Sequence, residues 1–133
     1  MSTSADFYIG TGPNARWLGH IAEDGSAAEM DEVGLFGDDG GDLRYVEATF
    51  IDIVETVVDD AWADEMGWGI NHGDGPDRPD DLPKPAMVYA FVTGSIHVFE
   101  IGEDMNGAAG MLLVAVHHPN GARKVTEFAG LAI

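Results

Sequence analysis

The sequence contains no cysteine, and this absence removes several classes of protein from consideration. A disulfide framework, a cysteine-ligated zinc or iron–sulfur site and a thiol nucleophile are all excluded. Long apolar runs are absent too: the longest, Met111 to Val116, is far shorter than the roughly 20 residues that a membrane-spanning helix needs. The first residues, Met1 to Asp6, have no basic region and no apolar stretch, so we expect no signal peptide and no membrane partner.

Basic residues are scarce. Six Lys and Arg stand against 24 Asp and Glu, and the formal net charge is -18. A chain this acidic is repelled by nucleic acid and by anionic membranes, which excludes direct nucleic-acid binding. The partner that its charge favours is a cation or a basic protein surface.

The acidic residues are concentrated in one part of the chain. Residues 23–81 hold nineteen of the 24 and only two basic residues, Arg44 and Arg78. Adaptation to high salt would coat the exposed faces of the C-terminal segments as well, and those are nearly neutral. The block indicates instead an acidic face directed at a partner, although the two causes can coexist.

Composition otherwise describes an ordinary globular protein. The chain has 133 residues, of which 45% are hydrophobic, enough to bury a core without disulfides. We expect a single domain over residues 1–133, with an acidic loop, helix and loop at 23–81.

The order of elements is readable from turn signals and periodicity. Residues 7–9 and 16–22 form an N-terminal hairpin. Residues 43–66 repeat their apolar positions at helical spacing, with Asp42 as N-cap and Gly67 as the stop. The stretches 23–42 and 67–85 are expected to be irregular connections, since both are rich in Gly and Asp or Pro.

The C-terminal third consists of strands. Residues 87–93 and 96–101 flank Gly94-Ser95, and residues 111–117 and 123–128 flank a second turn. The sequence therefore predicts an α+β fold: a mostly antiparallel sheet, made of the N-terminal hairpin and two C-terminal hairpins, packed against one central helix. The C-terminal strands are also where we expect subunit contacts if the protein forms a homo-oligomer.

The candidate partner-binding residues are acidic side chains of the helix and the following loop, joined by one tryptophan. Asp52, Glu55 and Asp59 lie on one side of the predicted helix. A tryptophan exposed on a loop would anchor a partner. The simpler interpretation is a solvated acidic surface. The set is Asp52, Glu55, Asp59, Asp60, Asp64, Trp68, Asp74, Asp77, Asp80 and Asp81.

A metal or catalytic role has weaker support. The loop 72–81 offers the oxygens and glycines that Ca²⁺ or Mg²⁺ would need, with His72, Asp74 and Asp77 as weak candidate ligands, but it lacks the EF-hand spacing. No zinc-protease motif or serine-nucleophile elbow occurs, and no carboxylate pair is singled out by spacing. We therefore expect no catalytic residue, no required cofactor and no enzyme.

One stretch resembles a known group of proteins. The small uncharacterised proteins of tailed phages, prophages and mobile elements share the pattern D-F-Y-x-G-x-G-P-x-A-x-W-L-G-x-I-A. This chain matches it with Asp6-Phe7-Tyr8-Ile9-Gly10-Thr11-Gly12-Pro13-Asn14-Ala15-Arg16-Trp17-Leu18-Gly19-His20-Ile21-Ala22. Where the group continues with an aromatic residue, this chain has Glu23-Asp24-Gly25. The resemblance implies an origin in a virus or mobile element, and it implies no activity.

Three hypotheses follow. The first is a non-enzymatic viral protein in the cytoplasm of its host that occupies the basic surface of a nucleic-acid-binding protein, as a nucleic-acid mimic and inhibitor of anti-CRISPR type. The second is a virion or accessory structural protein of a virus with a salt-loving host. The third is a divalent-cation-binding protein or hydrolase that uses the loop 72–81.

Overall fold

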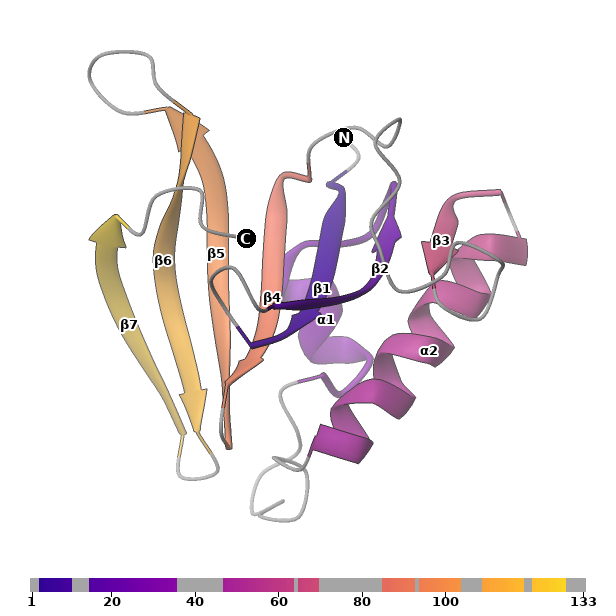
Figure 1. Ribbon diagram of the computed structural model, residues 1–133, viewed down its shortest axis with the longest axis horizontal. Helices are drawn as coiled ribbons and strands as arrows, with labels where there is room; N and C mark the ends of the chain where they lie inside the picture. The colour runs from indigo at the N-terminus through magenta and orange to yellow at the C-terminus, as the bar shows by residue number, and fades with distance from the viewer. Residues whose placement is uncertain are drawn as a thin grey trace.

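The fold is built from seven strands and two helices. The computed structural model describes residues 3–10, 15–35, 47–63, 65–69, 85–92, 94–103, 109–118 and 121–128 (Figure 1). In chain order the elements are β1 (Ala5–Ile9), β2 (Arg16–Ile21), α1 (Ala27–Glu32), α2 (Glu47–Ala63), β3 (Gly67–Gly69), β4 (Met87–Val92), β5 (Ser95–Glu103), β6 (Ala109–His118) and β7 (Gly121–Phe128). Neither described helix has the length and apolar character needed to cross a membrane.

The strands form one sheet in the order β3-β2-β1-β4-β5-β6-β7. Every neighbouring pair is antiparallel except β1 and β4, which run parallel and join the N-terminal hairpin to the C-terminal strands. A parallel pair needs a long crossover connection. Here α1, α2 and β3 lie within that connection. The predicted α+β class, with a mostly antiparallel sheet and one long helix, is confirmed.

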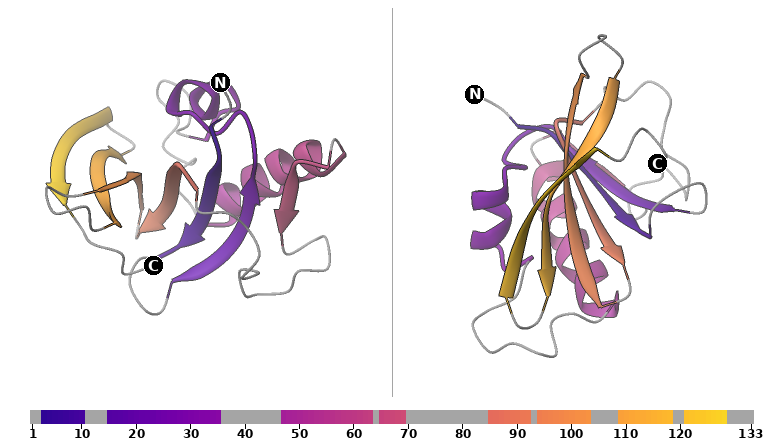
Figure 2. Two further views of the ribbon diagram at one scale, coloured as in Figure 1. Left: turned by 90° about the horizontal axis from the view of Figure 1, so that it is seen from above. Right: turned by 90° about the vertical axis from the view of Figure 1, so that its left-hand side faces the viewer.

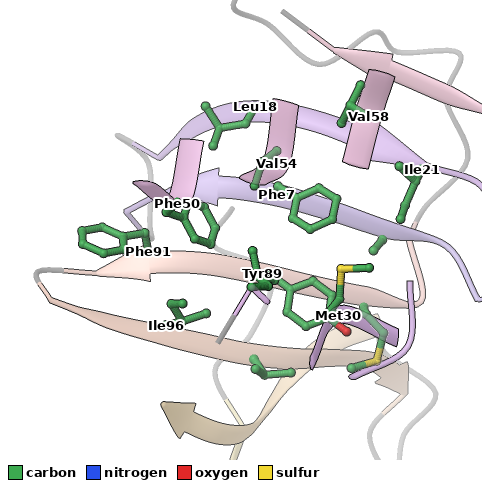
Figure 3. Packing of buried hydrophobic residues seen from close by; sticks show 14 residues of the cluster. Phe7, Leu18, Ile21, Met30, Phe50, Val54, Val58, Tyr89, Phe91 and Ile96 are labelled. Atoms are coloured by element: carbon green, nitrogen blue, oxygen red, sulfur yellow. The ribbon is translucent and has the colours of Figure 1, made fainter. Parts of the chain in front are cut away.

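Helix α2 packs on the sheet through residues spaced four apart. Phe50, Val54 and Val58 are its buried positions, and α2 lies over β2 and β3. The Phe50 ring meets Phe91 of β4 with the ring centroids 5.7 Å apart (Figure 3). Each such buried side chain contributes roughly 1.5–3 kcal/mol. Of the predicted helix 43–66, residues 65 and 66 are not helical, and residues 43–46 and 64 lie outside the described residues.

Helix α1 corrects the prediction that residues 23–42 are irregular. Ser26 is its N-cap: the Ser26 Oγ accepts from the Glu29 N–H at 3.3 Å and donates to Glu29 Oε1 at 3.0 Å. Ser26 and Glu29 stand at the two positions of a capping-box sequence, S-x-x-E. Met30 then buries its side chain in the core beside Tyr89 (Figure 3). Both helices therefore cover the same face of the sheet (Figure 2, right).

Strand β3 corrects the prediction that the chain is irregular from residue 67 onward. Gly67 and Gly69 pair with Ile21 and Gly19 of β2. A Cβ at Gly67 would lie 2.5 Å from the carbonyl oxygen of Val58, so only glycine lets this strand approach α2 so closely. The predicted helix stop thus also serves as a contact point between α2 and the sheet edge.

The opposite face of the sheet holds a second, smaller apolar cluster. Its buried members are Tyr8, Trp17, Val88, Ala90 and Phe99. A bulge in the β1–β2 ladder next to Tyr8 places Trp17 on this face while Leu18 joins the helix-covered core. The strand β7 forms one edge of the sheet.

Candidate functional site

Every charged side chain in the helical region is a carboxylate. This holds for the described residues 23–35, 47–63 and 65. Neither helix carries a basic residue in its last turn. A carboxylate in a last turn faces the negative end of the helix dipole, which costs roughly 0.3–1 kcal/mol. Asp31 and Glu32 of α1 and Asp60 of α2 are exposed acids of this kind.

A pocket with a volume of about 280 Å³ lies between α1 and α2. Apolar side chains such as Met30 and Val57 line it from inside, and carboxylates line it from the α1 side and the α2 side. A second hollow of about 270 Å³ continues along α2 and shares Val33, Val57 and Asp60 with the first. The two together are called the acidic groove here. Its carboxylates are Glu23, Asp24, Glu29, Glu32, Asp52 and Asp60.

The dimensions of the groove restrict what it can hold. Pockets for small molecules usually enclose roughly 300–1,000 Å³ and bury most of the ligand. Each hollow alone falls just below that range, and Val33, on the wall that the two share, is 49% exposed. The groove is therefore open to solvent rather than an enclosed pocket.

Two carboxyl groups in the groove interact directly. The backbone of Asp24 is left-handed, with φ 65°, in the turn before α1. A hydrogen bond shared with the Asp24 side chain raises the pKa of Glu29 above its ordinary value of 4.5; desolvation and the charges of Asp24 and Glu32 raise it further. Each of these effects disfavours the ionised form of Glu29.

The predicted partner-binding residues fall into four groups. Asp52 and Asp60 are exposed and line the acidic groove. Asp59 is exposed and Glu55 half-buried on α2, and neither lines the groove. Trp68, predicted on a loop, lies in β3 opposite His20, and its side chain is outside the described part. The remaining predicted residues lie outside the described part of the chain: Asp64, Asp74, Asp77, Asp80 and Asp81. The weak metal candidate His72 lies outside it too.

The α1 half of the groove was not anticipated from the sequence. Glu23, Asp24, Glu29 and Glu32 lie about thirty residues before the acids of α2 and meet them only in the folded protein. The Ser26-x-x-Glu29 capping box was the signal that could have located this short helix.

A buried polar cluster lies on the other face of the sheet. His20 Nδ1 is 2.6 Å from Asp6 Oδ1, and the Tyr8 hydroxyl donates to Asp6 Oδ2 at 3.2 Å. Asp6 and His20 are cross-strand partners in β1 and β2, and both are 0% exposed. An aspartate that orients a histidine is common in catalytic sites. With no solvent-exposed surface on either side chain, this pair acts here as an internal link between the two strands.

No metal site is apparent in the described part of the chain, where no three His, Asp or Glu side chains are grouped to hold an ion. The weak candidates of the loop 72–81 lie outside it, so calcium or magnesium binding there stays a prediction.

Comparisons with known proteins identify no related protein from which a function could be inferred. A scan against protein-family models finds no match, and searches of curated proteins and of solved structures find none either. Function has to be inferred from the groove and the cluster themselves.

Proposed function

We propose that the protein is a non-enzymatic, virus- or mobile-element-encoded binding protein whose acidic helices occupy a basic, nucleic-acid-binding surface of a host protein. It acts as a mimic of nucleic acid and thereby as an inhibitor. The observation that carries the proposal is that two acidic stretches, residues 23–32 and 52–60, are brought to one face of the sheet, around one groove.

Electrostatics supports a basic protein as the partner. The described residues 23–35, 47–63 and 65 carry carboxylates and no Lys or Arg. Such a surface attracts a positive surface and speeds its encounter, while like-charged nucleic acid is repelled. The carboxylates of α2 are also mutually repulsive, since Glu55 and Asp59 are four residues apart. A basic partner would relieve that repulsion on binding.

The buried pair of Asp6 and His20 does not support an alternative, catalytic function. Asp6 and His20 have no exposed surface, so a substrate would have no access to them. The resemblance of the N-terminal stretch to mobile-element proteins supports a host protein, rather than a protein of the same virus, as the target.

The test is capture of host proteins on the immobilised protein, followed by competition. We expect retention of nucleic-acid-binding proteins at low salt, steep loss as salt rises, and displacement by duplex DNA, because both ligands would occupy one basic surface. The control is the triple variant Asp52→Asn, Asp59→Asn and Asp60→Asn, whose sites are all exposed on α2. If the captured proteins are not displaced by DNA, or if the triple variant retains them equally, the proposal is wrong.

A further inference from the structure

The acidic groove has an exposed apolar wall as well as a charged rim. Val33, at the C-terminal end of α1, is 49% exposed, although valine is usually buried. Val57 of α2 faces both hollows, and Ile53 lines the second. Apolar side chains that are exposed between two acidic helices can be covered by an apolar side chain of a partner. A partner attracted by charge alone would not need to bring an apolar side chain.

The charges around these apolar side chains come from both sides of the groove. Asp60 of α2 lines both hollows, and Asp24 and Glu29 line the first from the α1 side. No basic side chain of the described residues lines either hollow. A partner that covers the apolar wall must therefore bring its own cations to the rim.

On the basis of the function proposed above, we propose that the acidic groove is a docking site for a basic amphipathic segment of the partner protein. Its apolar side chains pack against Val33, Ile53 and Val57, and its arginine or lysine side chains pair with the carboxylates of the rim. Helices that lie in a groove with one apolar stripe are a common mode of peptide recognition. Charge complementarity selects a basic segment from among such helices.

The two interacting carboxyl groups give the docking a distinctive signature. Asp24 and Glu32 are the carboxyl groups that act on Glu29, and Asp60 of α2 lines the same hollow. The Tyr89 hydroxyl of β4 is close enough to be influenced by the charge of Glu29. An arriving cation favours the ionised form of Glu29, so docking should release a proton below neutral pH. Calorimetry in two buffers of different ionisation enthalpy measures that release.

The test uses two synthetic peptides with the same number of arginines. One places leucines along one face of a helix, and the other has serine in place of each leucine. Covering a leucine side chain removes apolar surface from water, so we expect the leucine peptide to bind at least tenfold more tightly. Equal affinities for the two peptides would overturn the proposal, because an apolar wall would then play no part.

Matched variants locate the binding site. Asp60→Asn and Asp59→Asn remove the same charge from adjacent exposed residues of α2, but only Asp60 lines the groove. We expect Asp60→Asn to weaken binding of the leucine peptide about threefold at low salt, as one surface ion pair does. Asp59→Asn should change it less than twofold. Val33→Ser, at a half-exposed position, should weaken it about tenfold with little change in the melting temperature.

The outcomes separate this docking site from the function proposed above. Equal weakening by Asp59→Asn and Asp60→Asn would show that only overall charge matters, and the docking site would be wrong. If a captured host protein binds the Val33→Ser variant and the unaltered protein equally, the docking site fails while the proposed function stands. If the leucine peptide binds as expected but no nucleic-acid-binding protein is captured, the proposed function fails instead.

Discussion

The link between Asp6 and His20 makes a quantitative prediction about stability. Both side chains are 0% exposed, and His20 Nδ1 lies 2.6 Å from Asp6 Oδ1. Removal of either side chain therefore leaves the other one buried without this interaction. Breaking a buried pair in this way costs about 3–5 kcal/mol. A hydrogen bond to a charged group accounts for about 2 kcal/mol of that. We therefore expect each of Asp6→Ala and His20→Ala to cost at least 3 kcal/mol, and the double variant to cost about 2 kcal/mol less than their sum.

Urea unfolding, followed by tryptophan fluorescence, measures the four free energies of the double-mutant cycle. Cavity terms common to the single and double variants cancel in the coupling energy. If a single alanine variant fails to fold, the cycle is repeated with Asp6→Asn and His20→Gln, which keep most of the side-chain volume. Strict additivity of the two single effects would refute the link, since the residues would then be buried neighbours without a shared interaction.

Three further predictions concern the surroundings of the groove. The buried Tyr89 hydroxyl donates to the Gly25 carbonyl at 2.6 Å, so Tyr89→Phe should lower the free energy of unfolding by about 1–2 kcal/mol in urea titrations. Gly67→Ala places a Cβ 2.5 Å from the backbone of α2 and should cost at least about 2 kcal/mol, visible as a lower melting temperature. The hydrogen bond shared with Asp24 raises the pKa of Glu29 above 4.5, so the native state holds the Glu29 carboxyl proton more tightly than the unfolded chain does. Its stabilisation is full below pH 4.5 and is lost as pH rises through the raised pKa, and Glu29→Gln should abolish that part of the pH dependence of melting.

Local signals in the sequence were sufficient to predict the hairpins and the long helix. Gly94 adopts a φ of +79° between β4 and β5, the conformation that its place in a tight turn requires. The buried positions of α2 recur every four residues, and this period was readable directly. The antiparallel pairs β1–β2, β4–β5 and β6–β7 were predictable because each is a hairpin of two strands that follow one another in the chain.

The parallel pairing of β1 with β4 could not be predicted in the same way. Their paired residues, such as Ala5 and Met87, are far apart in the sequence. No local pattern specifies which distant strands pair with each other. Helix α1 has six residues and one buried side chain, Met30, which is too short for a periodic signal. Strand β3 contains two glycines, which in sequence indicate a loop, but here they allow close approach of backbones.

The same limitation explains why only half of the groove was predicted. The α2 acids Asp52 and Asp60 belong to a long helix whose exposed face could be derived from its periodicity. The α1 acids, such as Asp24 and Glu29, face them only because both helices pack on one side of the sheet. Charge density in the sequence identified the region, whereas the meeting of its two parts depends on the tertiary structure.

The placement of the acids distinguishes between the two causes considered for them. A coat that adapts a protein to salt needs only exposure, and it has no preference for one face. Of the strand side chains that the structure describes, Glu100 is an exposed acid and Asp6 is buried, whereas Glu32 of α1 and Asp52 and Asp60 of α2 are exposed acids that line the same groove as Val33. Acids in the last turns of both helices, Asp60 among them, reduce helix stability. The basic partner that we propose would compensate this cost in folding free energy when it binds, which adaptation to salt alone would not do.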